Sequence, residues 1–238
     1  MSKATSLHEL RIPTDEAPQE QRDYSVTSGR TKVYFKHLEA HLIEHIRESQ
    51  VVMGCVAWLT SESIIEALSS KDTAIVVQKE DFLRPDLEAR GGWPQRLREL
   101  YRTLKCDLDR YAFPGLISNL SVCGDPSIEP IRCVGNHNKD KAAAFPRSHH
   151  KFVVFGKIVR VAPTPERAYT VTHVVPYAVW TGSYNFTKNA GSSFENAVYI
   201  DDLSVVRAYV KEFSQVFALS ESLDWTSPWA APEYRIGT

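Results

Sequence analysis

The chain has 238 residues, a formal net charge of −1 at pH 7 and a hydrophobic fraction of 43%. This length can bury a sizeable core, and the composition is that of a globular protein, which argues against wholesale disorder. No apolar run approaches the roughly 18 residues of a membrane-spanning helix, and the start of the chain lacks the apolar segment of a secretory signal. We therefore expect a cytoplasmic protein that does not enter a membrane.

Composition divides the chain into three segments. Residues 1–27 are polar and aperiodic and predict a mobile N-terminal arm. Residues 28–222 carry the periodic patterns of one folded domain, whose last element is a helix predicted over 203–219. Residues 223–238 contain two prolines and predict an irregular C-terminal tail that packs as a strap.

The first half of the domain alternates strands and helices. A short strand is predicted over 31–35, and an amphipathic helix follows in which apolar residues recur every four positions from Leu38. Two continuous apolar strands, 50–59 and 73–78, are joined by a helix that begins at a hydroxyl N-cap. This order is typical of a parallel βαβ crossover. We therefore expect the α/β class, with a mixed, largely parallel β-sheet flanked by helices on both faces.

The first helix carries three histidines on the side opposite its apolar stripe. These are His37, His41 and His45, and the order from His41 to His45 fits the His-x-x-Glu-His motif of the inverted zinc proteases. A catalytic zinc would need a third ligand that the sequence does not identify. We therefore interpret the three histidines as a solvent-facing surface and predict no metal site here.

The middle of the chain is basic. Residues 84–160 hold fourteen lysines and arginines against eight acidic residues, a local net charge of +6 that could gather phosphate groups. A helix is predicted over 94–108, and the same region could equally supply solvated helix faces that only cover the sheet. The candidate nucleic-acid contacts are Arg98, Arg102, Lys105, Lys139, Lys141 and Arg147.

Two strands are predicted over 116–123 and 128–134, before a short basic loop. His137 opens a His-x-Lys triplet there, but no apolar strand follows it, so we interpret it as a loop residue. A zinc cluster that includes Cys123, Cys133 and this histidine is an alternative whose spacing fits no known finger.

Two short segments carry the chemistry. His149 and Lys151, at the head of an apolar strand, are two residues apart and therefore point to the same face. Ser183 and Asn185 have the same spacing after a second apolar run, 174–180. Histidine works near neutral pH as a nucleophile or proton carrier, while lysine and asparagine can stabilise charge on phosphoryl oxygens. The pattern therefore points to attack on a phosphodiester.

The order of these segments is also informative. His149-x-Lys151, then Gly-Ser-x-Asn185, then Glu195-Asn before a strand over 197–200, resembles the phospholipase D superfamily. Within it, the chain is most similar to the small single-motif bacterial nucleases that dimerise. The resemblance implies a phospholipase D-like catalytic domain over residues 28–222.

The resemblance also implies roles for the site residues. His149 would form a covalent phosphohistidine, Glu195 would orient its imidazole, and the equivalent histidine of a second subunit would protonate the leaving group. Lys151, Ser183 and Asn185 would bind the phosphate. No cofactor and no metal ion is implied. His150 points to the opposite strand face and is interpreted as a packed structural residue.

Two departures from the family pattern stand out. Gly156 occupies the position of the family's aspartate, and we interpret it as a turn residue. The segment 157–177 is longer than the family's tight hairpin, and we expect it to form an extended hairpin that alters the rim of the active site.

The substrate is less well defined than the chemistry. We expect a homodimeric endonuclease that favours DNA over RNA, with a restriction or anti-phage role and partner proteins of a defence system. Two alternatives stay open. One is a phospholipase that acts on lipid phosphodiesters, and the other is an inactive nucleic-acid-binding module of the same fold.

Overall fold

One β-sheet forms the centre of the protein. The structure is a computed structural model that describes residues 4–88, 91–107, 129–137 and 145–233. The sheet strands are β1 (Val26–Ser28), β2 (Thr31–Tyr34), β3 (Val51–Val56), β4 (Asp72–Gln78), β5 (Ile131–Val134), β6 (Lys151–Val161), β7 (Val171–Gly182) and β8 (Ala197–Ile200). Their order across the sheet is β1-β2-β8-β7-β6-β3-β4-β5.

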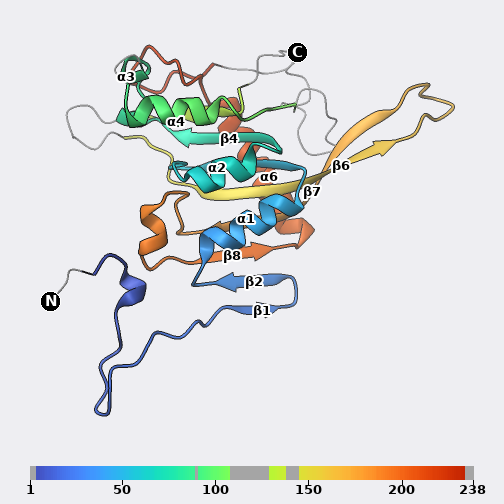
Figure 1. Ribbon diagram of the computed structural model, residues 1–238. Helices are drawn as coiled ribbons and strands as arrows, with labels where there is room; N and C mark the ends of the chain where they lie inside the picture. Colours follow the sequence, from blue (N-terminus) through green and yellow to red (C-terminus); the bar gives the residue numbers. More distant parts are fainter. Residues whose placement is uncertain (1–3, 89–90, 108–128, 138–144, 234–238) are drawn as a thin grey trace.

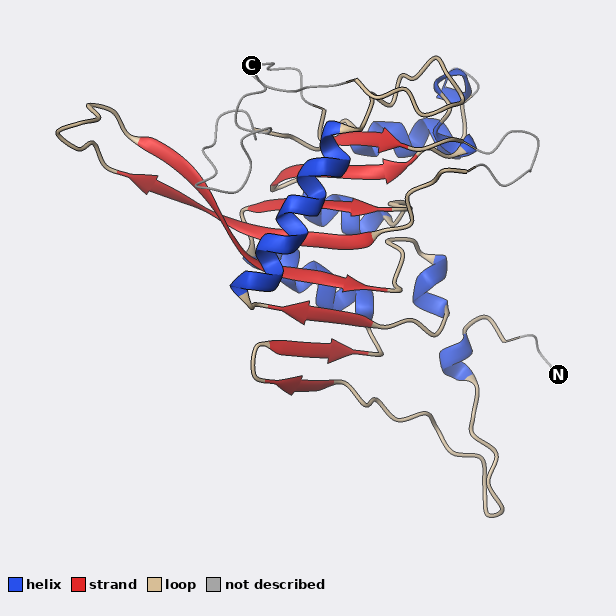
Figure 2. Cartoon of the chain, turned by 180° about the vertical axis from the view of Figure 1, so that it is seen from behind, coloured by secondary structure: helices blue, strands red, loops and turns tan. Residues whose placement is uncertain are grey.

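Helices cover both faces of this sheet. In Figure 1, α1, α2 and α4 lie in front of the strands, and Figure 2 shows α6 running across the opposite face. This arrangement confirms the predicted mixed α/β class with helices on both faces. The helices are η1 (Leu7–Glu9), α1 (Leu38–Glu48), α2 (Glu62–Leu68), η2 (Asp81–Leu83), α3 (Pro85–Glu88), α4 (Trp93–Tyr101), η4 (Asn189–Ser192) and α6 (Leu203–Ala218).

The predicted predominance of parallel pairing is wrong. β3 pairs in parallel with β4, and β4 with β5, but the other five strand pairs of the sheet are antiparallel. The βαβ unit β3-α2-β4 is confirmed, with Ser61 as the N-cap of α2. The chain then returns through β6, which lies antiparallel to β3, and continues into β7 by a hairpin. Hairpin connections produce antiparallel neighbours, so the strands from the second half of the chain make most of the sheet antiparallel.

Helix α4 is shorter than the sequence predicts. It ends at Tyr101, and the chain beyond it runs beside the first residues of β4, where Thr73 N donates to Lys105 O at 2.8 Å. Pairing with a strand edge therefore replaces the last turns of the predicted helix. The strand predicted over 116–123 lies outside the described residues, and β5 covers the second half of the strand predicted over 128–134.

The expectation that the α1 histidines face solvent is wrong for His45. Its side chain is 6% exposed, because its ring stacks on Tyr199 at 4.0 Å between ring centroids. Its Nε2 lies 3.1 Å from the hydroxyl of Tyr34, which also stacks on His41. Strands β2, β6, β7 and β8 each place an aromatic ring against His45, a tertiary contact that helical periodicity does not reveal. In the described part of the chain, no three His, Cys, Asp or Glu side chains gather as a metal site.

His45 should make the stability of the protein depend on pH. Burial lowers the pKa of His45, and the nearby Lys32 lowers it further, against the opposing effect of Glu48 and Glu44. Below the ordinary histidine pKa of about 6.5 the unfolded chain therefore binds a proton that the folded chain does not. We expect the free energy of unfolding to fall as the pH decreases below that value, and to level out below the pKa of the folded protein.

Urea unfolding at a series of pH values between neutral and mildly acidic conditions measures this dependence. The His45→Gln variant should be less stable at neutral pH but lose less stability on acidification. An equal slope in both proteins would show that another group is responsible.

The hairpin of β6 and β7 extends far beyond the sheet, as predicted, and projects as a two-stranded ribbon in Figure 1. Its turn lies past the Thr164–Arg167 bridge. Gly156 is therefore not a turn residue, which corrects the sequence interpretation. It lies inside β6 at an irregularity in the pairing, where a Cβ atom would meet Val174 Cγ1 at 2.9 Å.

The hairpin does not border the predicted site, which is a second correction. It leaves the sheet at the carboxyl end of β6, whereas His149 precedes the first residue of that strand. The rise along a strand separates the two ends of β6 by roughly 30 Å.

The C-terminal segment packs against the end of β4. Lys79 follows this strand, is fully buried, and donates to Glu221 Oε1 at 2.6 Å, Ser227 O at 3.1 Å and Trp229 O at 2.9 Å. These contacts agree with the expectation that the C-terminal tail packs against the domain as a strap.

At the other end of the chain, His8 Nε2 lies 3.0 Å from Ser193 O, so the N-terminal arm contacts the body of the protein. The division into arm, domain and tail stays a prediction. Across the described residues, none of the helices combines the length and the apolar character needed to cross a bilayer.

Candidate active site

Four strand ends bring the predicted site residues to one edge of the sheet. β3 and β7 end at this edge, whereas β6 and β8 begin there, because β6 is antiparallel to β3 and to β7. The register pairs Val56 with Lys151 and Gly182 with Ala197. The segments just outside these strands, which contain His149, Ser183 and Glu195, therefore meet at this edge.

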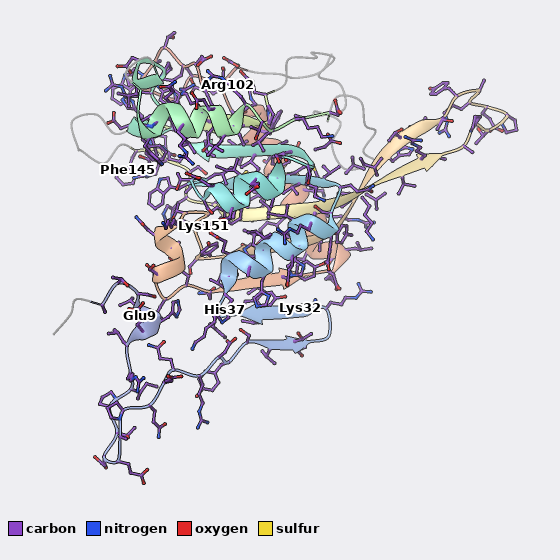
Figure 3. All side chains as sticks on the ribbon, in the orientation of Figure 1. Glu9, Lys32, His37, Arg102, Phe145 and Lys151 are labelled. Carbon is purple, nitrogen blue, oxygen red and sulfur yellow. The ribbon has the colours of Figure 1, made fainter. Side chains whose placement is uncertain are left out.

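His149 and Lys151 are in direct contact. The Lys151 Nζ lies 3.2 Å from both ring nitrogens of His149 and donates to the His149 carbonyl oxygen at 3.0 Å. The lysine side chain is 8% exposed, while His149 is open to solvent. Figure 3 shows Lys151 at the edge of the sheet. An ammonium group held this closely would also be within reach of a phosphate that contacts the imidazole.

The electrostatic surroundings favour a neutral imidazole. Partial burial lowers the pKa of His149, and the positive charges of Lys151 and Arg147 lower it further. Burial also lowers the pKa of Lys151, and Arg147 adds to this effect, whereas Glu195 opposes it. A neutral histidine beside a cation has a free lone pair, which a nucleophile requires.

Ser183 and Glu195 form a second pair at this edge. The Ser183 hydroxyl donates to Glu195 Oε2 and accepts from Asn196 N at 3.0 Å. The nitrogens of His149 contact Lys151 rather than this carboxylate, so the orienting role of Glu195 stays a prediction. Asn185 belongs to the same segment, and its buried Oδ1 has no hydrogen-bond partner among the described residues. A buried amide oxygen without a donor is unusual, and a hydrogen-bond donor of a ligand would satisfy it.

The sequence did not identify several residues that contact His149 or support the segment that carries it. The Trp58 indole lies edge-on to the His149 ring at 6.0 Å between centroids and donates through Nε1 to Glu80 Oε1 at 2.9 Å. The same carboxylate oxygen accepts from the guanidinium of Arg147. Gln78 Oε1 accepts from Ser148 N at 2.7 Å. The signal in the sequence was the polar triplet 78–80 at the end of a buried strand, since polar residues there need partners.

Replacing Glu80 with glutamine should weaken this support. The variant keeps an acceptor for Trp58 but leaves the Arg147 cation without its carboxylate beside His149. We expect the His149 titration, followed by NMR of its ring protons, to move to lower pH, because an unbalanced positive charge disfavours protonation.

The double variant Glu80→Gln with Arg147→Gln is the matched control. It removes both charges and should return the titration toward that of the wild-type protein. An unchanged titration in the single variant would show that the charge of Glu80 does not affect His149 and that its carboxylate only holds Trp58 and Arg147 in place.

The prediction that Arg98 contacts nucleic acid needs correction. This side chain is 5% exposed and donates to Leu223 O at 2.9 Å and to Asp224 Oδ1 at 3.1 Å, so it fixes the C-terminal segment. Arg102 is exposed, and Lys105 is exposed beside Asp72 at 3.7 Å. Lys139 and Lys141 lie outside the described residues. Arg147 pairs with Glu80 and lies close enough to His149 to lower its pKa, so among the candidate nucleic-acid contacts that the structure describes it is the one next to the site.

His150 lies on the opposite face of β6 from Lys151, toward α6. Its Nε2 is 3.2 Å from Glu212 Oε1, and its ring meets Phe152 edge-on. Its side chain is nonetheless 44% exposed, so it is a surface contact rather than a packed core residue.

No protein-family model matches the chain. A curated relative, the uncharacterized protein L381 of Acanthamoeba polyphaga mimivirus, is 32% identical over 219 residues, which cover 85% of this chain and 70% of that protein. The chain therefore belongs to the same family as L381.

Two solved structures also align with most of the chain. Nuc of Salmonella typhimurium, described as a phospholipase D family member, covers 80% of this chain and 95% of its own, at 16% identity and a TM-score of 0.46. NucT of Helicobacter pylori covers 81% of this chain and 98% of its own, at 12% identity and a TM-score of 0.48.

Proposed function

We propose that the protein is a metal-independent phosphodiester hydrolase of the phospholipase D superfamily, and that its substrate is a nucleic acid. The observation that carries this proposal is the contact, at 3.2 Å, between the exposed imidazole of His149 and the buried side-chain nitrogen of Lys151. Ser183, Asn185 and Glu195 arrive at the same edge of the sheet.

The reaction follows from these groups. A ring nitrogen of His149 attacks phosphorus, a P–N bond forms, and the bond to the leaving alkoxide breaks. The equivalent histidine of a second subunit gives its proton to that alkoxide. In the second step that histidine takes a proton from water, the resulting hydroxide attacks phosphorus, and the P–N bond breaks, which returns both imidazoles to their starting states.

The remaining residues would stabilise the charge that develops. Lys151 and the Nδ2 group of Asn185 would donate to the non-bridging oxygens of the phosphate. Glu195, which already acts on Lys151, would hold this cation or the imidazole in place. One chain supplies one such histidine. The mechanism therefore requires a homodimer in which the sheet edges that carry His149 in the two subunits face each other.

Turnover of bis(p-nitrophenyl) phosphate by the purified protein tests the proposal. We expect activity that persists in excess EDTA and an acid-labile phosphoryl group on His149. Loss of activity on chelation would contradict the metal-free mechanism. A folded dimer without turnover would instead favour the non-catalytic nucleic-acid-binding module.

A lipid phosphodiester is the second candidate substrate. The exposed Trp229 of the C-terminal segment is the feature that could favour it, because aromatic side chains are enriched at membrane interfaces. Binding to liposomes without cleavage of nucleic acid would support this alternative. The preference for DNA over RNA and the restriction or anti-phage setting with partner proteins stay predictions.

A further inference from the structure

A cavity of about 590 Å³ opens beside the candidate active site. It lies between the first residues of α1 and α2, the start of α4 and the segment that follows Asn185. Its lining residues are Glu39, Thr60, Ser61, Glu62, Ser63, Trp93, Thr187, Lys188 and Asn189.

Two segments lead from the site into this cavity. Phe186 N donates to Trp58 O at 3.1 Å, and Thr60 N donates to Phe186 O at 2.8 Å, so the two segments run side by side. Trp58 touches His149, and Asn185 belongs to the candidate site. The cavity lining begins two residues further along each segment, at Thr60 and Thr187, and Thr187 N turns back to donate to Asn185 O at 2.8 Å. Two residues span at most about 6–7 Å of chain, which is within the reach of one unit of a polymer whose phosphate contacts His149.

The cavity combines one aromatic surface with a polar wall. Trp93 is 48% exposed, and Phe82 packs against it at 5.2 Å between ring centroids, which supports the indole from one side. The two carboxylates of the wall have partners: Glu62 accepts from Arg96 at 2.8 Å and Glu39 accepts from Ser61 at 2.9 Å. These pairs leave hydroxyl and carboxylate oxygens as hydrogen-bond acceptors around the tryptophan.

The residues that line the cavity fit a nucleic-acid phosphodiester better than a lipid phosphodiester. A lipid acyl chain needs a continuous apolar wall, whereas eight of the nine lining residues are polar. A nucleobase has a flat aromatic face and an edge of hydrogen-bond donors and acceptors, and stacking of bases on tryptophan is a common mode of single-strand binding. Lys188 supplies a cation at the cavity for a neighbouring phosphate.

We propose that this cavity binds the nucleotide next to the scissile phosphate, with its base stacked on Trp93. The inference rests on the proposed function and names its substrate class as single-stranded nucleic acid. A base within a duplex is already stacked on its neighbours and paired, so it can enter the cavity only when the strand is open.

The test compares two substrates, a short single-stranded oligonucleotide and bis(p-nitrophenyl) phosphate, which has no base. Trp93→Ala should lower kcat/KM for the oligonucleotide about tenfold or more relative to kcat/KM for the small substrate, since stacking on an aromatic residue contributes roughly 1–3 kcal/mol per base. Trp93→Phe should restore most of that loss. The matched control is Tyr169→Ala, which removes an aromatic ring that is 65% exposed at the far hairpin.

Each outcome decides the inference. An equal loss on both substrates, or no loss on either, would overturn it, as would faster cleavage of the duplex than of its single strand. If the wild-type protein hydrolyses neither substrate, the proposed function fails, and binding of the labelled oligonucleotide is measured by fluorescence anisotropy instead. A tenfold weaker affinity of Trp93→Ala would then support the binding cavity, and equal affinities would overturn it.

Discussion

The His149→Ala variant is expected to lose phosphodiester hydrolysis by at least about a thousandfold, while it still folds and dimerises. The variant removes the group that forms the P–N bond, and loss of a covalent nucleophile costs several orders of magnitude in kcat. The measurement is turnover of bis(p-nitrophenyl) phosphate at neutral pH, together with a circular dichroism spectrum and the sedimentation of the dimer.

The neighbouring residue offers a matched control. His150 is the same residue type, one position along the chain, and half-exposed on the opposite face beside Glu212. His150→Ala should keep turnover within a few-fold of the wild-type protein. Equal losses in the two variants, or an acid-labile phosphoryl group that survives His149→Ala, would refute the role of His149.

Lys79→Met is expected to destabilise the protein by about 3–5 kcal/mol, because it leaves the carboxylate of Glu221 buried without its cation. Glu221 is 4% exposed, and Lys79 also holds two carbonyl groups of the C-terminal segment. The free energy of unfolding in urea measures the loss. The transition of the variant should lie at clearly lower urea concentration.

Two further variants identify the cause of this loss. Lys79→Met combined with Glu221→Leu removes both charges and should recover part of the stability, since no charge is then left unpaired. Arg11→Met removes a cation from the exposed pair with Glu20 and should cost less than about 1 kcal/mol. If Lys79→Met costs no more than Arg11→Met, the buried pair does not fasten the C-terminal segment.

The elements of the fold were largely predictable, because hydrophobic period and caps are local signals. The strand with His149 at its head, the stripe of α1 and the long hairpin all follow from residues close in sequence. The relative direction of the paired strands was not predictable in this way. The antiparallel pairing of β6 with β3 joins segments about one hundred residues apart, and no local pattern records it.

The same limit applies to the site. The spacing of His149 and Lys151 predicted one shared face, and the two side chains are in contact. The basic composition of its region made Arg98 a candidate nucleic-acid contact, whereas the C-terminal segment covers its side chain and supplies two of its acceptors. The roles of Trp58 and Glu80 depend on contacts with a loop that arrives much later in the chain. The role of a residue that depends on partners far away in the chain is difficult to predict from a single sequence.

The pairing of β3 with β6 has a consequence for the synthesis of the protein. The apolar strands β3 and β4 leave the ribosome long before β6, the antiparallel neighbour of β3, has been synthesised. At roughly 5–20 residues per second, the hundred intervening residues delay that pairing by about 5–20 s. During this interval the nascent chain exposes a parallel strand pair with an open apolar edge, which is a target for chaperones and a hazard for aggregation at high expression.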